Sequence, residues 1–159
     1  MNDQELEKII REYIDKTVHM SLATVSADRP WVCEVHFTYD DDLNLYFRST
    51  PARRHSQEIE DNPHVAGNIV DTFPLDDPRP AVGIYFEGTA EQVEDESLYD
   101  EIYELFERRL DVNESIIDDA KRADGHKFYK ISVQNWYAFG RFGDSGAKKH
   151  ELAWNGGEK

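Results

Sequence analysis

The chain has 159 residues, of which 39% are hydrophobic and 12% aromatic, enough apolar material for one compact domain with a single core. We therefore expect residues 1–159 to form a single domain. The formal net charge of −15, from 33 acidic against 18 basic residues, would repel a phosphate backbone and argues against nucleic acid as a partner.

The cellular compartment follows from two further features. The N-terminus is acidic and lacks the apolar segment of a signal peptide, and no apolar run approaches the ~18 residues of a membrane span. Cys33 is the only cysteine, so no disulfide can form within the chain, as is usual in a reducing compartment. These features predict a cytoplasmic protein with no membrane contact.

The first half of the chain changes from helical to strand periodicity. Apolar residues recur at helical spacing after a capping residue, Asn2 or Asp3, and predict a first helix that runs to Ile14. The next apolar runs are β-branched and aromatic and predict an antiparallel meander of three strands, His19–Ser26, Trp31–Tyr39 and Leu43–Ser49. A short helix at Arg53–Asp61 should end before Asn62-Pro63, because proline disfavours helix in the preceding residue.

The second half adds three strands and two helices. The strands are predicted at Val65–Asp71, Ala81–Val93 and Phe128–Phe142, and the helices at Ser97–Leu110 and Val112–Ala123. Gly88 marks a bulge in the long middle strand, Thr72–Pro80 is a proline-rich loop, and Gly143–Lys159 is a glycine-rich tail. This order predicts an α+β domain: a six-stranded antiparallel split β-barrel with flanking helices, and not a doubly wound parallel sheet.

Basic residues gather in one segment of this acidic chain. No Asp or Glu occurs between Asp42 and Glu58, and this window contains Arg48, Ser49, Thr50, Arg53, Arg54 and His55. A strand ends and a helix begins here, and a helix N-terminus with arginine side chains binds phosphate well. Solvated arginines that offset the acidic surface are the alternative. The absence of acids favours a phosphate site.

Several motifs follow one another in the order typical of one protein family. They are Leu22-Ala23-Thr24, Phe47-Arg48-Ser49, Arg53-Arg54-His55, Asn62-Pro63-His64-Val65 and the strand Gly83–Ala90. With them the chain resembles the FMN-binding split-barrel superfamily, which includes the pyridoxamine 5′-phosphate oxidases, and its end resembles the small general-stress branch.

The resemblance implies an FMN-binding flavoprotein that acts as a flavin-dependent oxidoreductase on an unidentified small molecule. It also implies a homodimer with the flavin at the interface. The expected cofactor-binding residues are Trp31, Val32, Cys33, Ser49, Thr50, Arg53, Arg54, His55, Lys149 and Trp154, with the phosphate on Ser49, Arg53, Arg54 and His55. The tail, Lys148–Trp154, lacks the Arg-x-His signature of the oxidases, so pyridoxamine phosphate oxidation is not predicted.

Other functions stay open at this point. A deazaflavin can replace FMN, and a non-catalytic protein that stores or senses flavin or haem fits the same resemblance, as does a barrel that has lost its ligand and acts in protein association. The spacing of His19, His36 and His64 predicts no metal site, and no catalytic residue is assigned. His150 is a functional candidate, whereas Trp136 and Tyr137 are expected in the core or a dimer interface.

Overall fold

The computed structural model describes residues 1–71, 76, 82–142 and 146–155, so the predicted loop Thr72–Pro80 lies, apart from Asp76, outside the described residues. The helices are α1 (Asp3–Ile14), α2 (Arg54–Asp61), α3 (Tyr99–Glu107) and α4 (Ser115–Lys121), with a single 3-10 turn, η1 (Glu96–Leu98), before α3. The strands are β1 (His19–Ser26), β2 (Arg29–His36), β3 (Thr38–Tyr39), β4 (Leu45–Ser49), β5 (His64–Ile69), β6 (Gly83–Gln92), β7 (Lys127–Gly140) and β8 (Lys148–Ala153).

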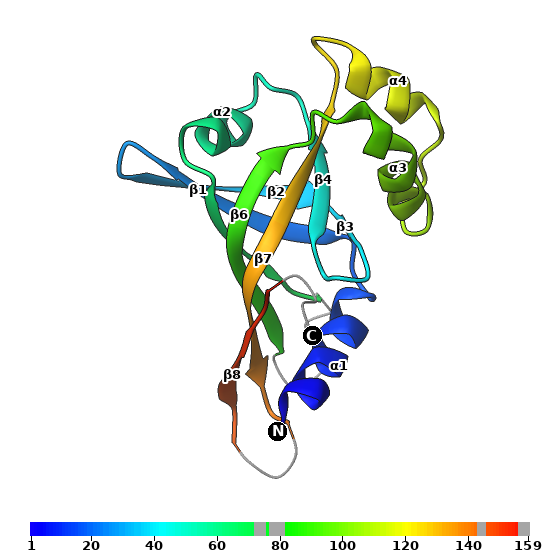
Figure 1. The fold of residues 1–159 in the computed structure, drawn as a ribbon. Coiled ribbons are helices and arrows are strands. Elements are labelled where there is room, and N and C mark those ends of the chain that lie inside the picture. The colour runs from blue at the N-terminus through cyan, green and yellow to red at the C-terminus, as the bar shows by residue number, and fades with distance from the viewer. Residues whose placement is uncertain (72–75, 77–81, 143–145, 156–159) are drawn as a thin grey trace.

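The strands form one curled antiparallel sheet, with α2, α3 and α4 at one end and α1 against the other (Figure 1). Its order is β2-β1-β5-β6-β7-β4-β3, and β8 pairs with β7. The predicted α+β split barrel is therefore confirmed. The predicted number of six strands is wrong, because the described residues form eight.

The two additional strands have different physical origins. The predicted strand Trp31–Tyr39 is divided because Phe37 leaves the ladder, donates its N–H to the carbonyl of Val18 at 2.9 Å and buries its ring in the core. The tail contributes β8, which pairs along β7 and turns Leu152 inward. A glycine-rich and charged tail gave no strand signal.

The β1–β2 hairpin is tighter than the sequence indicated. Ala27 and Asp28 form a two-residue turn with φ values of 49° and 59°, and Ser26 pairs with Arg29. Such a turn matches the twist of the flanking strands. Strand β2 therefore begins two residues before the predicted start at Trp31, and Pro30 is tolerated because β2 is an edge strand.

Gly88 forms the predicted bulge in the longest ladder of the sheet. The β6–β7 register shifts between Glu87 and Gly88, and a Cβ atom at Gly88 would lie 2.2 Å from the carbonyl oxygen of Ser132. Only glycine permits this approach of the two backbones. The bulge increases the local twist and curls β6 and β7 around the core.

The buried side chains form two clusters. The main core fills the barrel and the space under α1, and it includes Trp136, as predicted, together with Phe47 and Phe86. A second cluster lies between α3–α4 and the sheet and is built around Phe106 and Phe128. The second cluster fixes α3 and α4 beside the end of the barrel at which α2 begins.

Candidate functional site

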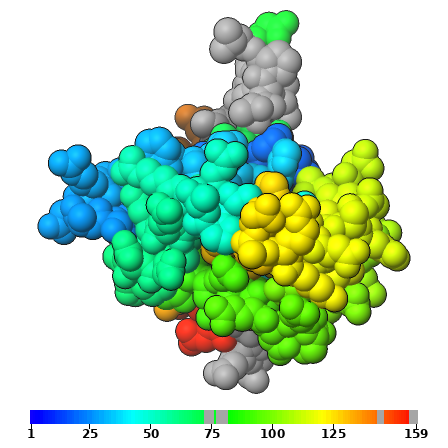
Figure 2. Space-filling model, turned by 90° about the horizontal axis from the view of Figure 1, so that it is seen from above, coloured from blue at the N-terminus to red at the C-terminus, as the bar shows by residue number. Residues whose placement is uncertain are grey.

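A groove of about 790 Å³ lies at the upper end of the barrel. Strand β2, the β4–α2 junction, the end of α3 and the segment before β7 all contribute to it. Seven predicted cofactor-binding residues line it: Trp31, Cys33, Ser49, Thr50, Arg53, Arg54 and His55. Figure 2 views this end, where α2 (teal) lies beside the α4 region (yellow).

The N-terminus of α2 supplies the cationic end of the groove. The chain turns after β4, where the N–H of Arg53 donates to Thr50 at 3.1 Å, and Arg53 then precedes the helix in an extended conformation. The first turn of α2 contains no acidic residue, and no side chain caps it. The free N–H groups and the positive end of the helix dipole are therefore available to an anion, without competition from a carboxylate in the first turn.

The two arginines of this junction have different surroundings. The Nε atom of Arg54 donates to Glu58 at 2.9 Å, and its guanidinium lies over the Trp31 ring at 4.3 Å from the centroid. Glu58 also accepts a hydrogen bond of 2.5 Å from Thr24. These hydrogen bonds, from Thr24 and then Arg54, hold the pKa of Glu58 below its usual value. Arg53 is exposed and has no side-chain partner among the described residues.

His55 belongs to a buried hydrogen-bond network below this junction. Its Nε2 atom lies 2.8 Å from Ser49 Oγ, its Nδ1 atom lies 3.3 Å from Cys33 Sγ, and Ser56 donates to Ser49 at 3.1 Å. Burial, followed by the charge of Arg53, lowers the pKa of His55. Burial raises the pKa of the Cys33 thiol. With both ring nitrogens engaged, neutral His55 positions Ser49 and the start of α2.

Sequence reasoning did not predict a second cluster at the groove, in which Asp119 and His126 join Arg48 of the acid-free window. Asp119 Oδ2 accepts from Arg48 Nη2 at 2.9 Å and lies 3.1 Å from His126 Nδ1. Burial alone would raise the pKa of Asp119, but the hydrogen bonds from His126 and the charge of Arg48 hold it below the usual value. Arg48 and Asp119 are 71 residues apart and meet because β4 pairs with β7, so no local pattern predicts their contact.

The groove also has apolar walls. Phe106 at the end of α3, followed by Leu110 and Val112, lines it together with Trp31 and Val35 of β2. A cavity with apolar sides and a few convergent polar groups suits a flat ring that carries an anionic group.

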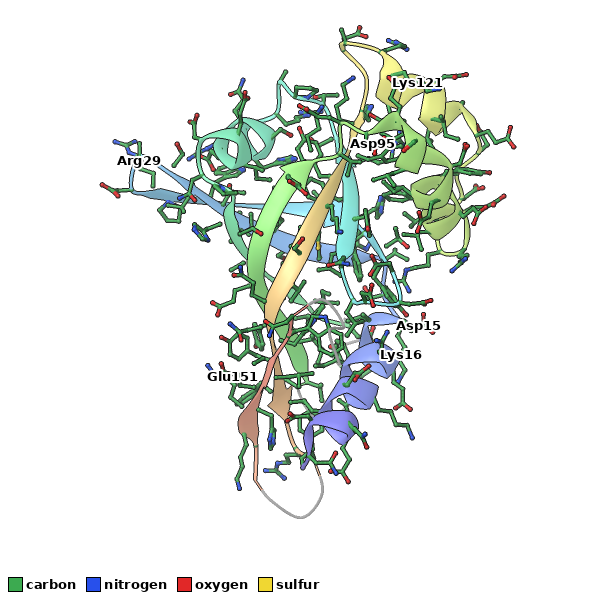
Figure 3. The ribbon with its side chains drawn as sticks, viewed as in Figure 1. Asp15, Lys16, Arg29, Asp95, Lys121 and Glu151 are labelled. Atoms are coloured by element: carbon green, nitrogen blue, oxygen red, sulfur yellow. The ribbon has the colours of Figure 1, made fainter. Side chains whose placement is uncertain are left out.

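Three predicted cofactor-binding residues are not part of this groove. Val32 projects from the opposite face of β2 and is 59% exposed. Trp154 is buried in the core and donates its indole N–H to the carbonyl of Asp42 at 2.7 Å. Lys149 lies on β8 with Nζ 4.6 Å from the centroid of Tyr137. Figure 3 shows Glu151 of β8 in the lower half of the molecule, far from Lys121 of α4.

Two further features bear on metals and membranes. Among the residues that the structure describes, no three His, Cys, Asp or Glu side chains gather as metal ligands. No described helix is both long and apolar enough to cross a membrane.

Comparison with known proteins places this fold in a family. The family model described as pyridoxamine 5′-phosphate oxidase matches residues 6–140. A comparison with curated proteins finds no match.

Solved structures give a consistent likeness. The General Stress Protein 26 of Bacillus anthracis is 22% identical, with a TM-score of 0.64 over 94% of this chain and 98% of that one. HutZ, the haem storage protein of Vibrio cholerae, is 20% identical, with a TM-score of 0.63 over 94% of both chains. A haem-binding protein of Mycobacterium smegmatis is 19% identical, with a TM-score of 0.68 over 90% of this chain, which spans 55% of that protein. At these identities the likeness shows the fold.

Proposed function

Because this chain belongs to the pyridoxamine 5′-phosphate oxidase family, we propose that its groove binds FMN and that the protein is a flavin-dependent oxidoreductase acting on a small molecule. The observation that carries the proposal is the cationic end of the groove. In a chain with a net charge of −15, Arg53 and Arg54 stand together at an acid-free helix N-terminus beside apolar walls. The single free cysteine, Cys33, fits a cytoplasmic location.

The residues present fit the phosphate and the ring system of FMN. Arg53, Arg54, Thr50 and the first N–H groups of α2 are suited to the phosphate, since arginine offers planar paired donors and a helix N-terminus adds backbone donors. Trp31 and Cys33 on β2, with Leu110 and Val112 after α3, supply surfaces for the ring system. FMN would supply the redox chemistry, whereas the chain binds and orients the ring and excludes water from it.

A homodimer is part of this proposal. The outer face of β6 and β7 carries Tyr85 and Phe139, both large and exposed, beside Tyr137. Pairing two such faces about a two-fold axis would bury aromatic surface, and a specific interface needs more than about 1,000 Å². Lys149 lies over Tyr137 on this face, and a dimer would give it a position next to a second chain.

A haem-binding or haem-storage protein is the second candidate. Two structural neighbours carry such descriptions. The groove also contains His126, whose Nε2 atom has no partner among the described residues, whereas its Nδ1 atom is bonded to Asp119. A deazaflavin fits the features that favour FMN, because it also joins a flat tricycle to a phosphate.

One experiment separates these ligands. The purified protein is examined by absorption spectroscopy, and the ligand released on denaturation is identified by mass spectrometry. FMN bands, with bleaching on addition of NADH or NADPH, are the expected result and support an oxidoreductase. A released deazaflavin identifies that cofactor, and a Soret band supports the haem protein. A colourless protein that takes up neither FMN nor haem contradicts both candidates and leaves a role in protein association.

A further inference from the structure

His126 lies at the edge of the groove, immediately before β7, and is held by Asp119 at two points. Asp119 Oδ2 lies 3.1 Å from His126 Nδ1 and accepts the backbone N–H of His126 at 3.1 Å. About half of the His126 side chain is exposed. Because the carboxylate occupies Nδ1, the lone pair at Nε2 is directed away from Asp119 and is available to a ligand.

The backbone between these two residues is shaped for this contact. A Cβ atom at Gly125 would lie 1.7 Å from the carbonyl oxygen of Asp119, so the close return of the chain under α4 requires glycine. Arg48 of β4 donates from Nη2 to the same oxygen, Asp119 Oδ2, at 2.9 Å and so helps to hold the carboxylate in place. A histidine that donates one ring N–H to a fixed carboxylate is the usual arrangement of a metal-ligating imidazole.

The other histidine and cysteine side chains of the groove are less suited than His126 to ligate iron. Both nitrogens of His55 are engaged by Ser49 and Cys33. The ring of His36 packs against His19, with centroids 4.4 Å apart, and no carboxylate orients it among the described residues. Cys33 contacts His55, and burial raises the pKa of its thiol. The remaining histidines, His19, His64 and His150, do not line the groove.

The surroundings of His126 fit a porphyrin. Leu110 and Val112 supply apolar surface in the same groove, and Arg53 and Arg54 supply charges that suit two carboxylates. We propose that this groove can hold a haem whose iron His126 would ligate, and that Asp119 is the positioning residue of His126. This inference rests on the second candidate of the proposed function.

The test is a titration of the apo-protein with hemin, followed by Soret absorption, electron paramagnetic resonance and the affinity for hemin. Wild-type protein should give the spectrum of a histidine-ligated haem. His126→Ala should lose that spectrum and bind hemin at least about tenfold more weakly, whereas loss of the oriented carboxylate in Asp119→Asn should weaken binding by roughly ten- to a hundredfold. In Asp119→Asn the histidine-ligated spectrum should persist, with a more positive reduction potential, because a negative charge next to the imidazole is gone.

His64→Ala is the matched control, because His64 is an exposed histidine on β5 outside the groove, and circular dichroism checks that each variant is folded. An unchanged spectrum for folded His126→Ala overturns the inference while the haem candidate stands. Loss of the spectrum in His36→Ala, with His126→Ala unaffected, overturns it in the same way. If wild type binds no hemin, the haem candidate and the inference both fail, and FMN binding is judged by the released ligand alone.

Discussion

The guanidinium carbon of Arg54 lies 4.3 Å from the centre of the Trp31 ring, so an arginine at the start of α2 is stacked on an edge strand that is distant in the chain. Trp31 is 40% exposed, and Arg54 is also bonded to Glu58. The contact joins β2 to α2 at the cationic end of the groove. It holds a positive charge in place before any ligand arrives, which lowers the cost of ordering that side chain on binding.

Trp31→Ala should weaken FMN binding without unfolding the protein. A cation–π contact at an exposed site contributes about 0.5–1 kcal/mol, which corresponds to roughly a two- to fivefold loss of affinity. The measurement is quenching of FMN fluorescence on titration. Val32→Ala is the control, because Val32 is on the same strand but faces away from the groove. An equal loss in both variants would show that the effect comes from the strand and not from the stacked pair.

Gly88→Ala should destabilise the fold. The added Cβ atom would meet the Ser132 backbone at 2.2 Å, and overpacking of this kind costs about 1–3 kcal/mol. Gly146→Ala is a matched substitution, since a Cβ atom there has nothing within 4 Å and the change should stay within about 0.5 kcal/mol. Urea unfolding of the two variants gives the comparison. Equal stability would mean that the β6 and β7 backbones separate easily at the bulge.

The fold could be predicted from the sequence wherever the residues of one segment alone show the hydrophobic alternation or turn residues of its structure. The alternation and turn residues of β1 and β7 are local, and Gly88 marks its bulge because a backbone contact excludes any side chain. Strand β8 was missed because its six residues include Lys148, Lys149 and Glu151, and only the existing edge of β7 makes a strand of them.

The site likewise has a part that a local sequence pattern predicts and a part that depends on contacts between distant segments. The acid-free window from Arg48 to His55 is a local signal, and its polar and basic residues meet in the groove. The contact of Asp119 with Arg48 depends on the β4–β7 register and on the second core cluster, neither of which has a local pattern. Trp154 lies in the core and not at the groove, a position that depends on the pairing of β8 with β7 and that its own segment does not indicate.

The free energy of unfolding should decrease as the pH is lowered, and His55 should account for part of that decrease. Its pKa is lowered in the folded protein, so the unfolded chain binds more protons as the pH drops below about 6.5. The contribution of neutral His55 is therefore complete above that pH and is lost as the pH falls toward the folded-state pKa.

The measurement is the free energy of unfolding between pH 7.5 and about pH 5. His55→Gln should flatten the profile in this range, whereas His64→Gln, at an exposed site on β5, should not. A profile of His55→Gln parallel to that of wild type would contradict a buried neutral histidine.

Phe139→Asp should convert the proposed dimer into a monomer. A charge on the aromatic outer face of β6 and β7 would be buried without a partner in the dimer, which is costly. Leu98→Asp is the control, because Leu98 is similarly exposed at the other end of the molecule. Light scattering at micromolar concentration reports the mass. A monomeric wild type would contradict the dimer itself. A dimer in both variants would show that the interface lies elsewhere.

The double substitution Arg53→Ala with Arg54→Ala should release FMN and leave the fold intact. Each charge-assisted partner of a phosphate contributes about 1.5–3 kcal/mol, or roughly ten- to a hundredfold in affinity. The fold should survive because Arg53 has no side-chain partner among the described residues and the Arg54–Glu58 pair is partly exposed, so it adds little to stability. Glu58 also keeps its hydrogen bond to Thr24.

Two comparisons make this test specific for the phosphate. Riboflavin, which lacks the phosphate, should bind wild type more weakly than FMN and should respond little to the double substitution. Arg29→Ala with Arg108→Ala removes the same two charges from exposed sites outside the groove, so it measures the effect of net charge alone. FMN affinity should fall only in the first pair, as measured by fluorescence titration at fixed ionic strength. Two outcomes would contradict a phosphate site at the N-terminus of α2. One is a double variant of Arg53 and Arg54 that still purifies with full FMN, and the other is a control pair that loses FMN equally.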